Sequence, residues 1–221
     1  GRDLRAKLSL FCSVPLDAVI EAPDVESIYE VPLVFEQQGL DQQILMLLQL
    51  RSRTSDGAEW KEWVRRQKNP RREVTVAIAG KYTELKDAYK SLEEAVTHAG
   101  IANNCRVRLR WVDVSKDKPE FALKGMDGVI IPGGFGERGI EGKVAAARYA
   151  RRNNIPFFGL CLGLQIAVIE AARGLLKLPA ANSTEFDPDT KDPVIHLLPG
   201  QREVSAKGAS MRLGAWPCHL L

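Results

Sequence analysis

Residues 154–165 read Asn154-Ile-Pro-Phe-Phe-Gly-Leu-Cys-Leu-Gly-Leu-Gln165, an apolar run that ends at Cys161 between two glycines. Hydrophobic residues at helical spacing follow at once, so the pattern predicts a buried strand, a tight turn and a helix. Gly-x-Cys-x-Gly at such a junction is typical of the thiol form of a nucleophile elbow. The start of the helix, with its dipole and free N–H groups, favours a thiolate. A lone cysteine is more often a small buried hydrophobe, but the flanking glycines lead us to interpret Cys161 as a nucleophile.

A second glycine-rich stretch, Pro-Gly-Gly-Phe-Gly at 132–136, follows the apolar run 128–132. It lacks both Gly-Lys-Ser/Thr and the G-x-G-x-x-G spacing, so neither fingerprint of a phosphate-binding loop is met. It is either a plain tight turn or a loop whose backbone N–H groups form an oxyanion hole. The carboxyl ends of parallel strands meet at one edge of a sheet, where this loop would face Cys161. We therefore favour the oxyanion hole.

Strands and helices are expected to alternate from residue 74 onward. The expected strands are 74–79, 106–114, 128–132 and 155–160, and the expected helices are 85–99, 142–152 and 162–173. Gly100 is expected to end the first of these helices. Such alternation predicts an α/β fold with a doubly wound, mostly parallel sheet covered on both faces.

The first 73 residues do not have this pattern. Residues 7–14 suggest a strand, 22–32 carry a helix-start signal, and 34–50 form an amphipathic segment interrupted at Gly39. Because these pieces are too few to bury a core, we expect residues 1–50 to be the tail of a larger domain. Residues 51–73 suggest a basic linker, with a helix at 58–67 docked by its two tryptophans.

Composition excludes several function classes. The chain has 221 residues and a formal net charge of +3, and segment 51–73 alone contributes +4, so no nucleic-acid-binding face is expected. The four cysteines form no C-x-x-C pair and the three histidines are not clustered, which argues against a zinc site or a disulfide framework. No signal peptide and no apolar run long enough to span a membrane are present. We expect a cytoplasmic protein.

Several motifs occur in an order that is typical of one family. They are Gly-Lys-Tyr at 80–82, Pro-Gly-Gly-Phe-Gly at 132–136, Arg138-Gly139 with Glu141-Gly142, Gly-Leu-Cys-Leu-Gly-Leu-Gln at 159–165, Asn-Ser-Thr-Glu-Phe at 182–186 and Met-Arg-Leu-Gly at 211–214. With them the chain resembles, over essentially its whole length, the CTP synthase family of class I glutamine amidotransferases. The resemblance implies three parts: the end of a synthetase domain (1–50), an interdomain linker (51–73) and a flavodoxin-like amidotransferase domain (74–221).

The resemblance also implies roles for individual residues. Cys161 would attack the carboxamide of glutamine, releasing ammonia and leaving a thioester that water hydrolyses. Backbone N–H groups of Gly134 and Leu162 would stabilise the oxyanion. Glutamine itself would be bound at Gly134, Leu162, Gly163, Leu164, Gln165 and Glu185. The fringe of the nucleotide sites would be Lys7, Pro23, Asp24 and Val25. GTP would act through Arg138, Gly139, Glu141 and Gly142, although an exposed hinge is an equal interpretation of that loop.

In the whole enzyme the ammonia would aminate UTP to CTP with ATP and Mg2+, under activation by GTP. The family forms homotetramers, and this chain alone is expected to bind none of these ligands completely and to hold no metal of its own. The family's His-x-Glu base is not found, because His98, His196 and His219 are followed by other residues. We therefore expect an internal piece of a CTP synthase, truncated before the His-x-Glu segment, with half a triad and little or no activity. The alternatives are a non-catalytic module that binds glutamine or GTP, and another cysteine-elbow enzyme such as a γ-glutamyl hydrolase or an intracellular protease relative.

Overall fold

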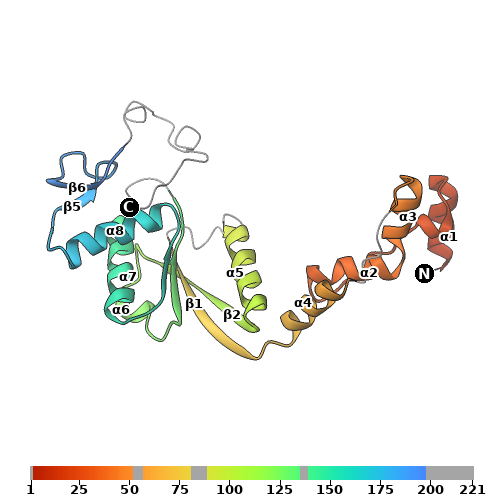
Figure 1. Cartoon of the computed structure of the whole chain (residues 1–221), viewed down its shortest axis with the longest axis horizontal. Coiled ribbons are helices and arrows are strands. Elements are labelled where there is room, and N and C mark those ends of the chain that lie inside the picture. Colours follow the sequence, from red (N-terminus) through yellow and green to blue (C-terminus); the bar gives the residue numbers. More distant parts are fainter. Residues whose placement is uncertain (1, 52–56, 81–88, 135–138, 198–221) are drawn as a thin grey trace. The chain divides into compact units, whose positions relative to one another are not determined.

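The computed structural model describes residues 2–51, 57–80, 89–134 and 139–197 (Figure 1). Contacts divide the chain into two compact units. The first unit comprises Gly1–Arg71 with Gly100–Cys105, and the second comprises Arg72–Ala99 with Arg106–Leu221.

The first unit is helical. It contains α1 (Arg2–Cys12), α2 (Val31–Gln37), α3 (Leu40–Leu47) and α4 (Ala58–Lys68), with short 3-10 turns at Leu16–Ala18 and Ile28–Glu30. The expected strand at 7–14 is wrong, because this segment lies in α1 and the loop that follows it. The polar–apolar alternation of those few residues concealed a helical spacing, Leu4, Leu8 and Phe11, that becomes visible only with the preceding residues.

Two other expectations for this unit are confirmed. Gly39 separates α2 from α3 and adopts φ 77°, a left-handed conformation that glycine accepts readily. The two tryptophans of α4 hold this helix against Tyr29, as expected of them. The Trp60 indole N–H donates to the Tyr29 carbonyl at 2.9 Å, and the Trp63 ring meets the Tyr29 ring edge-on with centroids 4.8 Å apart.

The second unit contains strands and helices that alternate along the chain, as expected. A four-stranded sheet has the order β2-β1-β3-β4, formed by β1 (Arg72–Gly80), β2 (Cys105–Asp113), β3 (Gly128–Ile131) and β4 (Phe157–Gly159). The pairs β1–β3 and β3–β4 are parallel. Helix α5 (Lys90–Ala102) lies on one side of the sheet, and α7 (Ile140–Arg152) with α8 (Leu162–Gly174) lies on the other (Figure 1). This arrangement confirms the predicted α/β fold class.

Three features of these strands and helices were not expected. The short helix α6 (Pro119–Ala122) and a second sheet of β5 (Ala181–Ser183) paired with β6 (Asp192–Ile195) have too few residues to show a hydrophobic period. Gly100 does not end α5. The helix continues to Ala102, Gly100 is buried within it, and Asn104 adopts the left-handed conformation, φ 51°. Asparagine is the residue other than glycine that most often takes this place after a helix.

The core of the second unit lies between the sheet and the two helices that follow the glycine loops. Ile131 of β3, Val144 of α7 and Ile166 of α8 are almost completely buried there. Helix α8 approaches the sheet so closely that a Cβ at Gly163 would overlap the carbonyl of Ile131. This approach fixes the position of the turn that carries Cys161. Within the described residues, no helix has the length and apolar content needed to cross a membrane.

Candidate active site

Cys161 occupies the turn between β4 and α8 and is the N-cap residue of that helix. Its backbone has φ 51° and ψ −104°, a conformation that residues with a Cβ rarely adopt and that costs about 1–3 kcal/mol. The turn is held by the Gly163 N–H, which donates to the Leu160 carbonyl at 2.8 Å, and by the Leu164 N–H, which donates to the Cys161 carbonyl at 3.1 Å. The side chain of Cys161 is exposed. A strained turn that presents a thiol to solvent is the geometry of a nucleophile elbow.

The turn needs both of its glycines. A Cβ at Gly159 would overlap the backbone of Gly163, in addition to the conflict already described between Gly163 and Ile131. The two glycines therefore allow the strand end and the helix start to lie against each other. Their presence in the sequence is explained by close packing and not by positive φ angles, because it is the cysteine that takes the positive φ.

The Gly133–Gly134 loop lies beside this turn. A Cβ built on Gly133 would be 3.4 Å from the Cβ of Cys161, and one on Gly134 would be 3.8 Å from Cδ2 of Leu162. Strands β3 and β4 are neighbours, and the Leu160 N–H donates to the Ile131 carbonyl at 3.0 Å, so the two loops leave the sheet side by side. The structure thus brings together the predicted nucleophile and the two predicted oxyanion residues. Residues 135–138, which include Arg138, lie outside the described part of the chain.

The residues expected to bind glutamine have different environments. Leu162 and Gly163 are buried, Leu164 is 60% exposed, and Gln165 is partly buried. The Oε1 atom of Gln165 is itself buried and has no hydrogen-bond partner among the described residues. Buried amide oxygens are normally hydrogen-bonded, so this atom is an exception among the described residues.

Glu185 lies in the turn after β5, half-buried, with its backbone N–H donating to the Ser183 hydroxyl at 3.2 Å. Helix α8 packs against both strands of this small sheet, which places the Glu185 turn in the same unit as the elbow. The three histidines occupy separate places. His98 lies in α5, His196 follows β6, and His219 lies outside the described residues.

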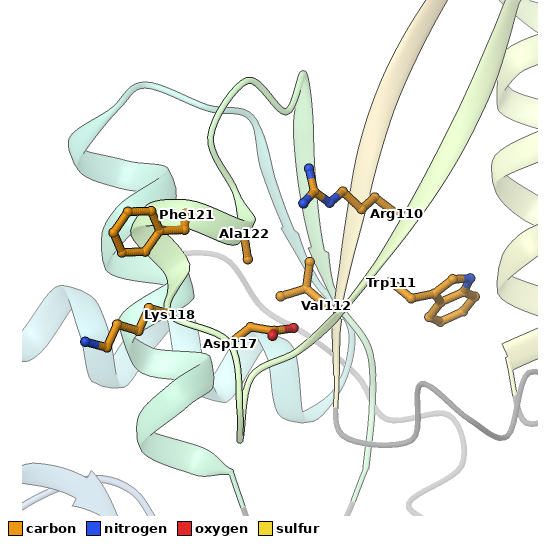
Figure 2. A pocket seen from close by; sticks show the side chains of 7 residues that line it. All are labelled: Arg110, Trp111, Val112, Asp117, Lys118, Phe121 and Ala122. Atoms are coloured by element: carbon orange, nitrogen blue, oxygen red, sulfur yellow. The ribbon is translucent and has the colours of Figure 1, made fainter.

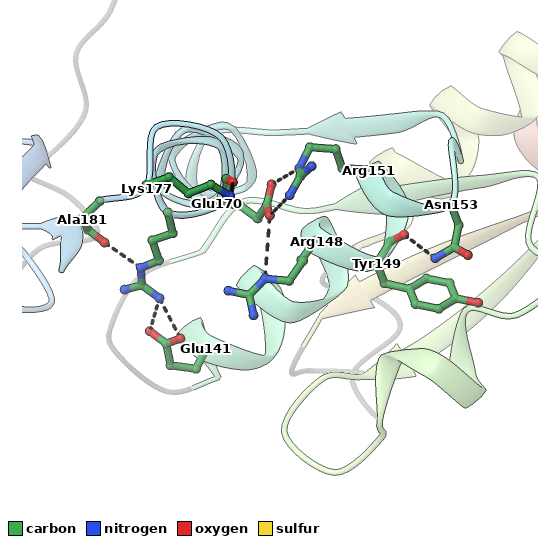
Figure 3. A network of polar contacts seen from close by, with 10 residues as sticks. Glu141, Arg148, Tyr149, Arg151, Asn153, Glu170, Lys177 and Ala181 are labelled. Atoms are coloured by element: carbon green, nitrogen blue, oxygen red, sulfur yellow. Dashed lines mark hydrogen bonds and ion pairs between the residues drawn. The ribbon is translucent and has the colours of Figure 1, made fainter. Parts of the chain in front are cut away.

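Salt bridges fix α7 and α8 relative to each other (Figure 3). The guanidinium of Arg151 donates two hydrogen bonds, of 2.7 and 2.8 Å, to the buried carboxylate of Glu170. This carboxylate, through its hydrogen bonds, raises the pKa of Arg151 above its usual value. At the other end, Arg173 of α8 donates to Glu141 of α7 at 2.8 Å and to the Ala181 carbonyl at 2.8 Å. The turn that carries Cys161 is therefore followed by a helix that is held to α7 by ion pairs at Glu170 and Arg173.

A cavity of about 460 Å³ lies near the start of α7. It is lined by Val114, Ser115, Gly139, Ile140, Glu141, Gly142, Asn182 and Phe186. Three of the four residues expected to respond to GTP are in this lining, and Glu141 is engaged there with Arg173. The role of GTP at these residues stays a prediction.

A smaller cavity, of about 240 Å³, lies between β2 and α6 (Figure 2). Its lining combines Arg110 and Lys118 with the ring of Phe121, and it contains no thiol or imidazole.

The residues expected at the fringe of the nucleotide sites belong to the first unit. Lys7 is exposed on α1, and Pro23, Asp24 and Val25 lie in the segment before the second 3-10 turn. Over the described residues, no group of three or more acidic, histidine or cysteine side chains could hold a metal.

One residue beside the elbow was missed by the sequence analysis. Lys143 of α7 is only 3% exposed. Its Nζ lies 4.0 Å from the position that a Cβ on Gly134 would occupy. The signal was present in the sequence, because Lys143 stands at a core position of the helical pattern that contains Ile140, Val144 and Ala147.

Comparison with known proteins adds two family matches. The family described as "Glutamine amidotransferase class-I" matches residues 84–221, and the family described as "CTP synthase N-terminus" matches residues 1–50. The CTP synthase of Caldanaerobacter subterraneus subsp. tengcongensis is 52% identical over 223 residues, and that of Symbiobacterium thermophilum is 54% identical over 226 residues. These alignments cover 100% and 99% of this chain. The chain spans 42% of the length of each relative.

A solved structure is also similar. It is described as the glutaminase domain of Trypanosoma brucei CTPS with bound acivicin, and it is 40% identical with a TM-score of 0.54. The match covers 58% of this chain and 52% of the other. At this identity the likeness extends beyond the fold to the sequence of the matched region.

Proposed function

Because the chain belongs to the class I glutamine amidotransferases and, among them, to the CTP synthase family, we propose that it provides the glutamine-hydrolysing site of a CTP synthase. The observation that carries this proposal is the exposed Cys161 on a strained turn, next to the Gly133–Gly134 loop. The match of residues 1–50 to the CTP synthase N-terminus speaks against a γ-glutamyl hydrolase or a protease relative, neither of which needs a synthetase domain.

In the proposed reaction the sulfur of Cys161 forms a bond to the side-chain carbonyl carbon of glutamine. The carbonyl oxygen becomes an oxyanion, which the N–H groups of Gly134 and Leu162 stabilise. When the carbonyl re-forms, the C–N bond breaks and protonated nitrogen leaves as ammonia. Water then attacks the thioester and releases glutamate, which restores the thiol. Gln165 would help to hold the substrate, because its Oε1 can accept a hydrogen bond donated by a substrate N–H group.

The proton transfers of this reaction need a base, and the sequence contains no His-x-Glu pair. We expect the 221-residue chain to hydrolyse glutamine slowly or not at all, whereas the whole gene product should be active. Absence of a His-x-Glu pair from the whole gene product would favour the alternative, a module that binds glutamine or GTP without turnover. The test below separates the two.

The remaining expectations concern the whole protein. Ammonia from the Cys161 site would reach a synthetase domain that uses ATP and Mg2+ to activate UTP for amination to CTP. Lys7, Pro23, Asp24 and Val25 would contribute to the edge of those nucleotide sites. Activation by GTP, assembly into homotetramers and a cytoplasmic location are likewise proposed from family membership.

The test is release of ammonia from glutamine by the purified gene product and by the 221-residue chain, each with a Cys161→Ala variant. Cys105→Ala serves as the matched control, because Cys105 lies at the start of β2 and has no proposed role. The proposal is supported if the gene product releases ammonia, the Cys161→Ala variant does not, and the Cys105→Ala variant still does. If the gene product binds glutamine or acivicin without releasing ammonia, the binding module is the better conclusion. Acivicin is a suitable probe because it occupies the T. brucei relative.

A further inference from the structure

The smaller cavity, between β2 and α6, has opposite charges at its two ends. Its volume is about 240 Å³, and it is lined by Arg110 of β2 and by Asp117 of the loop before α6. The guanidinium of Arg110 and the carboxylate of Asp117 lie apart, with Val112 and Ala122 between them (Figure 2). The ammonium of Lys118 points outward, away from Asp117. The cavity therefore presents hydrogen-bond donors at one end and acceptors at the other.

The positive end of the cavity has no opposite charge beside it. Arg108, the next arginine on the same face of β2, pairs with Glu73 at 2.6 Å, whereas Arg110 forms neither an ion pair nor a hydrogen bond with any residue of the described part of the chain. At the negative end, Oδ2 of Asp117 accepts a hydrogen bond from the Asp113 N–H at 3.0 Å. This bond fixes the direction of the carboxylate and leaves its other oxygen for a ligand.

The rest of the lining is apolar. Val112 is 2% exposed and Ala122 is 9% exposed, so they form a floor, while Phe121 at the rim is 77% exposed. The volume is below the range of about 300–1,000 Å³ that is usual for drug-sized ligands, which favours a smaller molecule. A guanidinium binds a carboxylate through two parallel hydrogen bonds, and a carboxylate accepts hydrogen bonds from an ammonium. An α-amino acid with an apolar side chain carries all three complementary groups.

We propose that this cavity binds a free α-amino acid with an apolar side chain. Arg110 holds the α-carboxylate, Asp117 holds the α-ammonium, and the side chain of the ligand covers the floor and the ring of Phe121. The residues of the elbow are not part of this lining. The proposed site is therefore distinct from the glutamine-hydrolysing site, and ligand binding there does not depend on the reaction at Cys161.

The experiment is equilibrium dialysis of the purified gene product against radiolabelled L-phenylalanine. Two unlabelled competitors, 3-phenylpropionate and phenethylamine, keep the ring but each lacks one of the charged groups. We expect saturable binding of L-phenylalanine. Each competitor should bind about tenfold more weakly or worse, because it loses the charge-assisted hydrogen bonds at one end of the cavity.

Variants test the two charged ends. Arg110→Met and Asp117→Asn should each weaken the binding of L-phenylalanine about tenfold. Asparagine keeps an oxygen that can accept the hydrogen bond from the Asp113 N–H, so the loop should keep its shape. Arg106→Met is the matched control, because Arg106 is an exposed arginine of the same strand that does not line the cavity. It should leave the affinity unchanged, and circular dichroism should show that all variants are folded.

A further control separates this cavity from the predicted glutamine site. Glu185→Gln alters that site and should leave the binding of L-phenylalanine unchanged. The proposal is overturned if the unaltered protein shows no saturable binding, or if 3-phenylpropionate binds as tightly as L-phenylalanine. It is also overturned if folded Arg110→Met and Asp117→Asn variants keep full affinity. Loss of binding in Glu185→Gln would assign the amino acid to the glutamine site and likewise overturn the proposal.

Discussion

Replacement of Gly163 by alanine tests the close packing that positions the elbow. Gly163 lies in the first turn of α8, and helix propensity alone predicts that alanine stabilises this position by about 1 kcal/mol. The structure predicts the opposite sign. The new methyl group would overlap the carbonyl of Ile131 and lie 3.2 Å from its Cβ, and neither group belongs to a flexible side-chain end.

The magnitude follows from these two terms. Overpacking against a fixed backbone costs typically about 1–3 kcal/mol, and here the helix must move away from the strand as a whole. We therefore take the upper end of this cost, about 3 kcal/mol, and after subtracting the propensity gain of about 1 kcal/mol expect Gly163→Ala to lower the free energy of unfolding by about 2 kcal/mol. The shift should also disturb the turn at Cys161, so that its alkylation by iodoacetamide changes.

The assay is urea unfolding followed by circular dichroism, with Gly174→Ala as the comparison. Gly174 ends the same helix, and a Cβ there would meet the side-chain ends of Arg151 and Glu170, which can move. Gly174→Ala should therefore cost less than Gly163→Ala. If Gly163→Ala were neutral or stabilising, the argument that glycine is required for close approach would be refuted.

Three further predictions concern charge and strain. Glu170→Gln should lower the free energy of unfolding in urea by about 1–2 kcal/mol, because it weakens the two hydrogen bonds from Arg151 to a buried group; an unchanged midpoint would show that the pair adds no stability. Hydrogen bonding to Arg65 lowers the pKa of Glu62 to about 2, so its stabilising effect is complete above pH 4.5 and is lost as the pH falls toward 2. Glu62→Gln should remove this part of the acid sensitivity of α4, and an NMR titration that places the carboxyl near pH 4.5 would contradict it. Cys161→Gly should be about 1 kcal/mol more stable than Cys161→Ala in thermal unfolding, since glycine accepts φ 51°; equal stabilities would mean that the turn is not strained.

Much of the second unit could be predicted because its elements are long and strongly periodic. The strands before Gly80, Pro132 and Leu160 are apolar runs, and the helices after them repeat hydrophobic residues at helical spacing. The adjacency of the Gly133–Gly134 loop and the Cys161 turn followed from a general property of parallel sheets, which does not depend on details of the loops.

What could not be predicted depends on tertiary contacts. The strands β5 and β6 are defined by pairing with each other and not by a pattern of their own. Residues 7–12 belong to a helix that begins with the residues preceding them in the chain. The helical pattern places Lys143 on the inner face of α7, but its burial depends on the packing around it, since a lysine on an inner face often reaches water along its flexible chain.

The parallel pairing of the sheet has a consequence for the order in which the second unit forms. Strand β3 pairs with β4 through Val129 and Phe157, 28 residues apart, and with β1 through Val76 and Gly128, 52 residues apart. Closing the shorter loop costs less chain entropy, and it brings α7 and α8 together over one face of the new strand pair. The β3-α7-β4-α8 segment is thus the natural folding nucleus, and β1 joins it later. Destabilising substitutions in β3 or α8 should slow folding, whereas those in β1 should mainly accelerate unfolding. The nucleophile turn would then be among the first parts of the chain to take its native shape, before most of the protein around it.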